Sequence, residues 1–242
     1  MKGLEMAVKR DSLGDRMKRH EHVSRKSLVS KVPVIIRVDG KAFHTFTRGF
    51  AKPFDYGMTA AMDCAAYRLA NEIQGCKAYY VQSDEASFLL TDYDKIESDG
   101  WFGYNQDKLV SLSAAYMSVF FGEAIKEFHE NVKAPVFDSR AFNIHREDVA
   151  NYFLWRMKDY HRNSVNMYAR AFFSTREMKF KKLSDVHDML HSVGKNWATD
   201  LTNREKNGKF MVYDKQWRSF LCPVEPFTLS YSYVQNELGE YV

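Results

Sequence analysis

The sequence predicts an α+β fold in which a split βαβ sheet, of the ferredoxin-like βαββαβ order, carries helices on one face. Two observations predict this fold. Short apolar runs rich in β-branched and aromatic residues recur over the first part of the chain, and segments with helical spacing separate them. Beyond residue 145 the spacing is mainly helical. We therefore expect a core over 1–144 that includes a basic N-terminal helix, and a mostly helical C-terminal extension over 145–242 that is integrated with the core.

The first part of the expected core combines a basic segment, a strand and a helix. Residues 9–30 have helix-compatible charged positions, and the β-branched run at 34–38 predicts a buried strand that Gly40 ends. The aromatic-rich segment that follows lacks a clear period, so we expect a loop. Apolar residues recur at helical spacing over 56–73, and Asp55 is positioned to cap that helix.

A hairpin and a long helix complete the expected core. Apolar runs at 79–81 and 86–90 flank a short polar turn at 82–85, which predicts a hairpin. The order strand, helix, strand, strand, helix, strand is that of the split βαβ plan. The other expected elements are a loop at 91–105, a helix at 106–129, a strand at 135–142, helices at 146–172 and 184–192, and strands or a strapped tail at 220–235.

Two acidic blocks suggest a metal site at one edge of the sheet. In the split βαβ plan we expect the first and third strands to be central and parallel, and the turn at 82–85 to lie near the C-terminal end of the first strand. Asp39 and Asp84 would then lie close together, and two close carboxylates repel unless cations neutralise them. Mg²⁺ binds carboxylate and carbonyl oxygens, such as that of Gly40, together with substrate phosphates. Either block alone is also typical of a plain turn, but together they predict metal-dependent nucleotidyl transfer.

Cationic and aromatic residues near these blocks would suit a nucleotide. Lys108 lies at the start of the expected long helix. The backbone N–H groups in the first turn of a helix are suited to bind an anion. Lys41 and Lys52 flank the loop after the first strand. Phe43 and His44 are candidates for stacking on a base, and the alternative is a core phenylalanine beside an exposed histidine.

Charge clusters along the chain leave two interpretations open. Lys and Arg gather at 9–26, 176–182 and 204–218, which suits either a phosphate backbone or solvated helix faces. The segment 155–170 is dense in polar residues for a helix, and it predicts either a surface for RNA or triphosphate or a contact between subunits.

The composition is that of an ordinary globular protein, with 45% hydrophobic and 27% charged residues and a net charge of +4. No apolar stretch approaches the length expected of a membrane span, and the N-terminal segment lacks the apolar centre of a signal peptide. Cys64, Cys76 and Cys222 have no metal-ligand spacing and cannot all pair with one another, which predicts free thiols. We therefore expect a cytoplasmic protein with no membrane partner.

Seven stretches of the chain, in order, resemble one family. The chain resembles the tRNA(His) guanylyltransferases and the tRNA(His) guanylyltransferase-like proteins, which add nucleotides to the 5′ end of RNA in the 3′-to-5′ direction. The catalytic domain of that family is similar to the palm of ordinary polymerases and to nucleotide cyclases, so the resemblance implies a palm-like catalytic core. The matching stretches are 37–47, 51–55, 83–88, 107–121, 137–142, 152–164 and 203–207.

The resemblance implies roles for individual residues. Asp39, the carbonyl of Gly40 and Asp84 would bind two Mg²⁺ ions, and Glu85 would be a further active-site acid. ATP and GTP, or another nucleoside triphosphate, would be substrates. The nucleotide would be held by the loop from Asp39 to His44, which comprises Gly40, Lys41, Ala42 and Phe43, and by Ser83 and Asp84.

The resemblance also implies contacts outside this loop. Lys108 would neutralise triphosphate charge, and Lys52 and Asp55 match positions near the nucleotide used in activation. The partner would be tRNA, and the family commonly forms tetramers built from dimers. The residues that match motifs tied to activity or RNA contact are Asp159, His161, Asn163, Arg204 and Lys206.

The run from His161 to Met167 departs from the pattern of the eukaryotic enzymes and is closer to the bacterial, archaeal and phage-type relatives. Those relatives repair 5′-truncated tRNA by template-dependent addition. The expected function is therefore 5′-end repair, addition of one guanosine to tRNA(His), or both, with ATP-dependent activation of monophosphorylated ends. The alternatives are a palm-fold nucleotide cyclase or cyclic-dinucleotide synthase, and a non-catalytic RNA-binding module.

Overall fold

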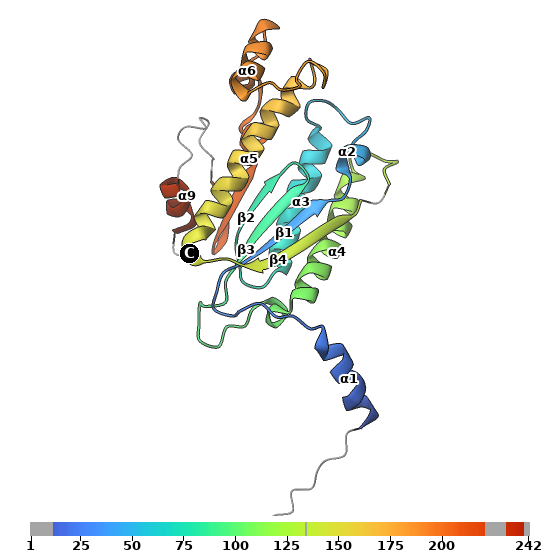
Figure 1. Cartoon of the computed structure of the whole chain (residues 1–242), viewed down its shortest axis with the longest axis vertical. Coiled ribbons are helices and arrows are strands. Elements are labelled where there is room, and N and C mark those ends of the chain that lie inside the picture. Colours follow the sequence, from blue (N-terminus) through green and yellow to red (C-terminus); the bar gives the residue numbers. More distant parts are fainter. Residues whose placement is uncertain (1–11, 134, 221–230, 240–242) are drawn as a thin grey trace, which may run out of the picture.

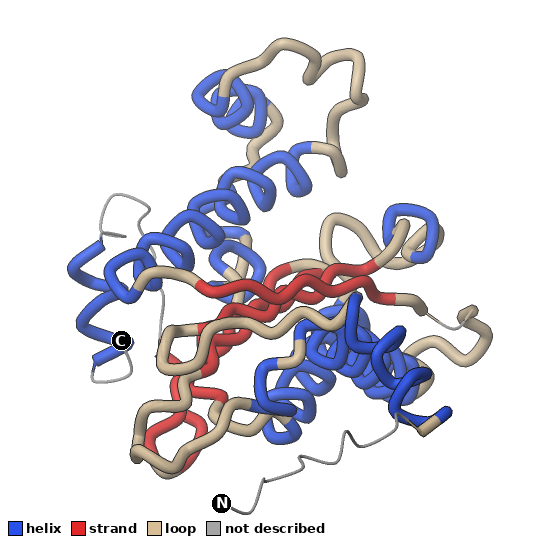
Figure 2. The backbone as a smooth tube through the Cα atoms, turned by 60° about the horizontal axis from the view of Figure 1, so that its bottom comes forward, coloured by secondary structure: helices blue, strands red, loops and turns tan. Residues whose placement is uncertain are grey.

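The computed structural model describes residues 12–133, 135–220 and 231–239, and these form a twisted antiparallel sheet with helices on both faces (Figure 1; Figure 2). The α+β fold class predicted from the sequence is confirmed. The sheet has six strands in the order β4-β1-β3-β2-β5-β6. The strands are β1 (Val34–Gly40), β2 (Cys76–Gln82), β3 (Glu85–Leu90), β4 (Phe137–Asn143), β5 (Lys209–Asp214) and β6 (Gln216–Phe220).

The helices expected over 56–73, 106–129, 146–172 and 184–192 are present with similar bounds, whereas a short helix at Phe43–Phe46 lies where a loop was expected. Asp55 caps α3 as expected, because its side chain accepts a hydrogen bond of 2.8 Å from the N–H of Met58. The α-helices are α1 (Leu13–Val23), α2 (Phe43–Phe46), α3 (Tyr56–Glu72), α4 (Gln106–Ile125), α5 (Val149–Ala169), α6 (Leu183–Ser192), α7 (Trp197–Asp200), α8 (Asn203–Asn207) and α9 (Tyr231–Leu238), and the short 3₁₀ turns are η1 (Trp101–Tyr104) and η2 (Arg146–Asp148).

The alternation of side chains along β1 divides the core between the two faces of the sheet. Ile36 and Val38 are buried against α3 and α4, in one cluster with Met62 and Met117. Ile35 points the other way and packs with Phe153 of α5. Successive side chains on a strand point to opposite faces, so the next odd-numbered residues of β1 also lie on the α5 face. The prediction of two helices on one face therefore holds for α3 and α4, and α5 covers part of the other.

β1 and β3 are antiparallel, so the expectation that the first and third strands are parallel is wrong. The register runs from Val34 opposite Leu90 to Asp39 opposite Glu85. The physical reason is that β1 inserts between β4 and β3 and pairs with each of them in the antiparallel sense. Because of this direction, the beginning of β3 meets the end of β1. A parallel pair would have put the two acidic blocks at opposite ends of the sheet.

The β5–β6 hairpin is the main element that the sequence analysis missed. Its residues were interpreted only as part of the basic cluster at 204–218, yet β5 pairs with β2 and extends the sheet. The run from Lys209 to Tyr213 does carry apolar residues of strand type. At the C-terminus, residues 221–230 of the expected strand or strapped tail lie outside the described residues, and 231–238 form α9.

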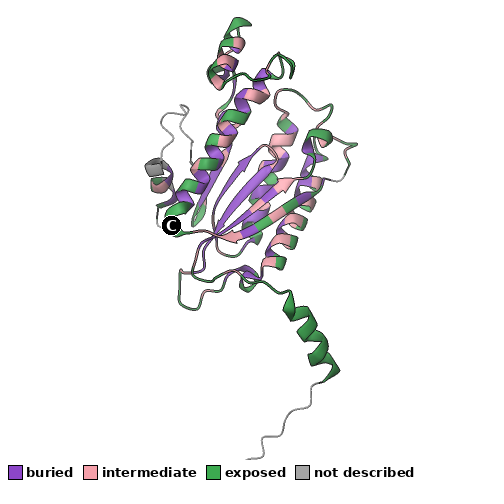
Figure 3. Cartoon of the chain, viewed as in Figure 1, coloured by how far each residue is buried: buried purple, intermediate pink, exposed green. Residues whose placement is uncertain are grey.

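Helices α4 and α1 differ in how far they are buried. By length and composition α4 could cross a membrane, which corrects the expectation that no apolar stretch approaches that length. Its residues Leu109, Met117 and Phe121 are nevertheless buried in the core against α3 and the sheet. In contrast, α1 has no buried residue and projects from the body of the protein (Figure 1; Figure 3).

Candidate active site

Asp39 and Asp84 meet at the end of β1, as the sequence predicts. Asp39 lies opposite Glu85 in the register, and the N–H of the following Gly40 donates a hydrogen bond of 3.0 Å to the carbonyl oxygen of Asp84. Burial, and then the nearby charges of Asp84 and Glu85, raise the pKa of Asp39 to about 6. Burial also raises the pKa of Asp84. Both shifts show that the ionised forms are poorly stabilised by the protein itself.

The donor set at this edge fits a divalent cation that is shared with a phosphate. No Lys, Arg or His among the described residues forms an ion pair with Asp39 or Asp84. The described segments also hold no group of three or more His, Cys, Asp or Glu side chains arranged for a metal. Mg²⁺ needs only one or two carboxylates when phosphate and water oxygens complete its shell. Asp39, Asp84 and the carbonyl of Gly40 therefore suit a Mg²⁺ ion whose shell is completed by phosphate and water oxygens. They do not suit a metal that is bound by protein ligands alone.

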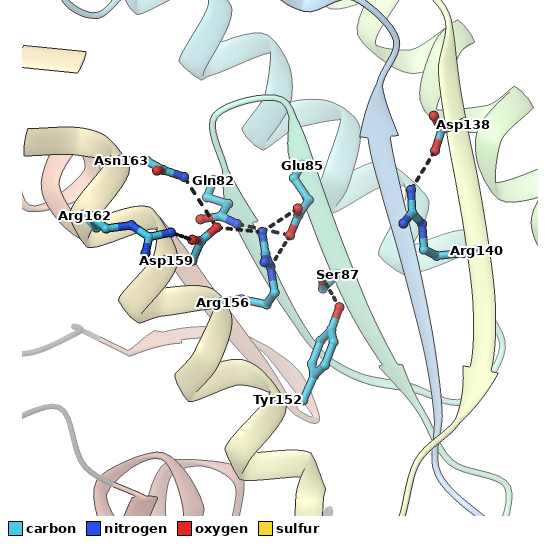
Figure 4. A network of polar contacts seen from close by, with 10 residues as sticks. All are labelled: Gln82, Glu85, Ser87, Asp138, Arg140, Tyr152, Arg156, Asp159, Arg162 and Asn163. Carbon is cyan, nitrogen blue, oxygen red and sulfur yellow. Dashed lines mark hydrogen bonds and ion pairs between the residues drawn. The ribbon is translucent and has the colours of Figure 1, made fainter. Parts of the chain in front are cut away.

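Glu85 lies beside the acid pair, but its carboxylate is fully engaged (Figure 4). Arg156 of α5 donates two hydrogen bonds of 2.7 Å to it, from Nε and from Nη2. Gln82 donates a third, of 3.1 Å. Arg156 and Glu85 are both buried. This bidentate pair is well matched in geometry, and it fixes α5 to the sheet next to the two free acids.

A cavity of about 600 Å³ opens on one side of the acid turn. It has the volume of a nucleotide-sized binding site. A second cavity, of about 290 Å³, is lined by Asp39, Glu85 and Arg156. Ser83 and Asp84 line both cavities. The predicted residues that line the larger cavity are Gly40, Ala42, Phe43, His44, Lys52, Asp55, Ser83, Asp84 and Arg204.

The loop after β1 and the turn between β2 and β3 each contain a residue with a backbone conformation that is typical of ligand sites. Ala42 and Ser83 both have positive φ, of 54° and 43°, a conformation that is uncommon outside glycine and is often found at binding sites. At Gly40 a Cβ atom would lie 2.3 Å from the ring of Phe43. Only glycine therefore fits at this position while Phe43 keeps its place.

The side chain of Phe43 packs in the core, although the residue also lines the larger cavity. Its side chain is 5% exposed, and its ring lies 5.5 Å from that of Phe121 and 5.0 Å from that of Phe137. Of the two interpretations of the Phe43–His44 pair, the core phenylalanine beside an exposed histidine is confirmed, and stacking of Phe43 on a base is wrong. Lys41 is exposed, and its N–H donates to the carbonyl oxygen of Val136.

We expect Gly40→Ala to destabilise the protein by about 1–3 kcal/mol, because the added methyl group forces the Phe43 ring out of a packed core. Urea unfolding followed by circular dichroism measures the change. Gly14→Ala is the matched control, since its added Cβ meets only the Ser12 hydroxyl, at 3.6 Å. Equal stability of Gly40→Ala and the unchanged protein would contradict this account of the glycine.

Two of the predicted cations lie away from the acid pair. Lys108 lies in the first turn of α4, which begins near Ala141, whereas Asp39 pairs with Asp138. The helix therefore starts toward the opposite end of the sheet from the acids, and the structure does not bring Lys108 to the site within one chain. Lys206 is buried and donates a hydrogen bond of 2.6 Å to the carbonyl oxygen of Ala198.

His161 and Asp55 both contact other side chains of the protein. The ring of His161 packs edge-on against Trp197, 4.5 Å away, and burial, followed by the charge of His187, lowers the pKa of His161 to about 4. Asp55 accepts hydrogen bonds from the N–H of Met58 and of Ala51 and contacts His129. Burial opposes the shift, but these hydrogen bonds lower the pKa of Asp55.

The remaining predicted residues lie near the cavities. Asp159 contacts Arg156 at 3.4 Å and also Arg162, and Asn163 donates to Asp159 (Figure 4). Asn163 lines the smaller cavity. Arg204 lines the larger one and forms an ion pair of 2.8 Å with Asp63 of α3.

One stripe of α5 is the part of the site that sequence reasoning did not resolve. Most of its residues recur every three or four positions and line the cavities, and this spacing within the polar segment 155–170 is the signal that was available. The stripe consists of Arg156, Tyr160, Asn163, Asn166 and Met167 of α5 and of Arg170, which follows the last residue of the helix.

The raised pKa of Asp39 predicts a pH-dependent effect on stability. The contribution of its neutral form is fully present below the unfolded pKa of 3.8 and is lost as the pH rises through about 6. We expect Asp39→Asn to raise the Tm of the metal-free protein by roughly 2–4 °C at pH 7.5, or about 1 kcal/mol once solvent screening of this half-exposed group is included. Thermal melts should show no gain at pH 4, and a gain of equal size at both pH values would contradict the assignment.

Comparison with known proteins gives a consistent set of similarities. A family model described as tRNAHis guanylyltransferase matches residues 14–145. A bacterial tRNA(His) guanylyltransferase (Thg1)-like protein in complex with ATP has a TM-score of 0.83 and 36% sequence identity, with 92% of this chain and 100% of that chain covered. A structure of a bacterial protein of the same description in complex with GTP has a TM-score of 0.77 and 34% identity, with coverage of 94% and 100%.

Curated relatives match over a shorter part of their length. The tRNA(His) guanylyltransferase of Debaryomyces hansenii is 34% identical over 149 residues, which are 58% of this chain and 54% of the relative. An uncharacterized protein of Acanthamoeba polyphaga mimivirus is 27% identical over 194 residues, 70% of this chain. The matches span 66% of the mimivirus protein and 54% of the Debaryomyces hansenii enzyme, so the chain covers between about half and two thirds of each relative.

Proposed function

The chain belongs to the tRNA(His) guanylyltransferase family, and on that basis we propose that it is a Mg²⁺-dependent nucleotidyltransferase that adds nucleotides to the 5′ end of tRNA in the 3′-to-5′ direction. The observation that carries the proposal is the meeting of Asp39 and Asp84, which form no ion pair with the described residues, beside a cavity of about 600 Å³. An RNA-binding module gains nothing from two close acids, because RNA is itself an anion.

The proposed reaction has two steps. The 5′-monophosphate of the RNA first attacks the α-phosphate of ATP, which forms an adenylylated 5′ end and releases pyrophosphate. The 3′-hydroxyl of an incoming GTP or other nucleoside triphosphate then attacks the 5′ phosphorus of the RNA, and AMP leaves. The added nucleotide keeps its own triphosphate, so the next addition needs no separate activation.

The chain's own residues bind and position the reactants. Asp39, Asp84 and the carbonyl of Gly40 would hold two Mg²⁺ ions, which lower the pKa of an attacking hydroxyl and stabilise a departing pyrophosphate when bound. Gly40 lets the loop backbone approach the phosphates. His44 and Lys52, which are exposed and line the larger cavity, would contact the nucleotide.

We also propose how the substrate is selected and how the protein assembles. Base pairing with the opposite strand of the acceptor stem would select the incoming nucleotide in 5′-end repair. The basic clusters would hold the tRNA, with an affinity that falls as salt rises. We further propose that the protein forms a tetramer built as a dimer of dimers and that it is cytoplasmic.

One assay tests the proposed function. The protein is incubated with tRNA that lacks its first 5′ nucleotide, with ATP, Mg²⁺ and each labelled nucleoside triphosphate in turn. We expect label at the 5′ end, and we expect its amount to fall at least 10-fold when the base opposite is changed so that it cannot pair, because wrong pairing misplaces the reacting 3′-hydroxyl. Removal of Mg²⁺ with EDTA should abolish the signal. A cyclic nucleotide formed without tRNA would instead support a cyclase.

A further inference from the structure

The segment that follows α5, residues 170–182, carries a concentrated positive charge. It contains five Lys or Arg residues and one acid, Glu177, whereas the whole chain has 35 Lys and Arg against 31 Asp and Glu. Glu177 accepts hydrogen bonds from the N–H and the hydroxyl of Ser174. The cations are exposed and form no ion pair with a described residue, so their charge is available to an anionic partner. They are Arg170, Arg176, Lys179, Lys181 and Lys182.

Two phenylalanines of this segment are exposed, and each lies beside a lysine. Phe180 is 91% exposed, more than any other aromatic side chain in the described part of the chain, and Nζ of Lys179 lies 4.9 Å from the centre of its ring. Phe172 is 42% exposed, and Nζ of Lys195 lies 5.4 Å from its ring centre. In contrast, Phe173 packs against the core cluster beneath the segment. Exposed rings gathered among cations favour a binding surface over ordinary packing.

The backbone presents Phe180 to solvent on an anchored turn. The φ of Phe180 is 64°, a value that is uncommon for a bulky residue and is often found at binding sites. The N–H of Lys181 donates a hydrogen bond of 3.2 Å to the carbonyl oxygen of Met178. Met178 and Leu183 pack against the apolar cluster that joins α5, α6 and α7. Because the residues on both sides are fixed, a ligand that stacks on Phe180 has less conformational entropy to overcome.

The segment begins at the larger cavity. Arg170 and Ala171 line that cavity together with Ser83 and Asp84 of the acid turn. From there the chain continues past the end of α5 to α6, which projects beyond the sheet (Figure 1). A surface that starts at the proposed reaction site and extends away from the sheet lies next to the end of the RNA. In a tRNA that end includes the 3′ strand, which extends beyond the acceptor stem as unpaired nucleotides.

We propose that residues 170–182 bind the unpaired 3′ overhang of the tRNA, with Phe180 and Phe172 stacked on its bases and the neighbouring cations on its phosphates. This inference rests on the proposed function and deepens it, because it assigns the second strand of the acceptor end to a surface of its own. Stacking on an aromatic ring suits every base, and cations contact phosphates without regard to sequence. A paired stem keeps its bases stacked on one another, so it contacts the cations but not Phe180. The overhang is therefore recognised by its lack of pairing.

Binding without chemistry tests the proposal. The full chain is titrated, without nucleotide or Mg²⁺, with two RNA hairpins that copy a tRNA acceptor stem and differ only in the presence of a short unpaired 3′ overhang. We expect the unchanged protein to bind the hairpin with the overhang about 10-fold more tightly. Phe180→Ala should remove most of that preference, and Phe180→Tyr, which keeps a ring, should retain it. Ile96→Ala is the matched control, because Ile96 is 92% exposed in the loop after β3, and it should change the binding of neither hairpin.

The dependence of affinity on salt separates the ring from the cations. Lys181→Ala should weaken both hairpins by a similar factor and reduce the slope of log affinity against log salt by about 1, because one phosphate contact is lost. Phe180→Ala should leave that slope unchanged. A third hairpin carries the same unpaired nucleotides in its loop instead of at its 3′ end, and we expect Phe180→Ala to change its binding little.

Four results would overturn the proposal. They are equal binding of the first two hairpins by the unchanged protein, full retention of the overhang preference in Phe180→Ala, and an equal Phe180-dependent gain from unpaired nucleotides in the loop. The fourth is a change in oligomeric state of Phe180→Ala with unchanged RNA binding, which would assign the ring to a contact between copies of the chain. If the unchanged protein transfers no nucleotide but shows the Phe180-dependent preference, the proposed function fails and the assignment of the overhang stands.

Discussion

Asp39→Asn is expected to reduce labelled-nucleotide transfer to tRNA by about 10³-fold or more, while the protein still folds. The amide keeps the size of the side chain but removes the charge that holds a divalent cation against phosphate. Electrostatic stabilisation of the transition state by such a cation accounts for a large part of the reduction of the activation barrier. The measurement is single-turnover incorporation at saturating Mg²⁺, combined with a thermal melt. The same substitution removes one of two close anions, so the metal-free protein should be more stable rather than less.

Asp107→Asn is the matched control for this experiment. Asp107 is an exposed acid in the first turn of α4, away from the acid pair and outside both cavities. Its substitution is expected to change transfer by less than 3-fold and stability by roughly 0.5 kcal/mol, through the helix dipole alone. Normal transfer by Asp39→Asn would show that this carboxylate does not take part in the reaction.

Arg156→Met is expected to lower the free energy of unfolding by about 3–5 kcal/mol, which corresponds to a fall in Tm of roughly 6–20 °C. The methionine fills most of the space but leaves Glu85 buried with only Gln82 as a partner. A buried carboxylate without its cation is one of the most destabilising changes in a protein core. Thermal and urea unfolding both measure the loss.

A double substitution separates the ion pair from simple packing. Arg156→Met combined with Glu85→Gln should regain at least half of the lost stability, because no uncompensated charge is left in the core. Arg162→Met is the control on the same helix, and because Arg162 is 63% exposed it should cost less than about 1 kcal/mol. No recovery in the double variant would mean that the cost arises from packing of α5 and not from the charge.

The acid pair shows how much of the site could be predicted from the sequence. The apolar run that ends in Asp39-Gly40 and the polar turn at Ser83-Asp84 mark two strand ends, and the chemistry of close carboxylates predicts the metal. The direction of the strands was predicted wrongly, although the predicted meeting of the acids was right. Local patterns specify where strands begin and end, but they carry no information on which edge a hairpin presents to an earlier strand.

Phe43, Lys108 and the α5 stripe show where the sequence was insufficient. An aromatic residue in a loop is compatible with stacking on a base or with core packing, and only the position of Phe121 and Phe137 decides between them. A lysine at a helix start suits an anion wherever the helix begins, but α4 begins at the wrong end of the sheet. The polar stripe from Arg156 to Arg170 was visible as a spacing, yet its partner surface was not.

By itself the sequence determined the α+β class, the positions of most helices and strands, the two acids and the family, because these depend on periodicity, turn chemistry and residue order within short segments. Only the tertiary structure decided that β1 and β3 run antiparallel, that β5 and β6 extend the sheet, and that Glu85 is paired with Arg156. Each of these depends on contacts between segments far apart in the chain, whose geometry is set by packing and by charge compensation rather than by local pattern.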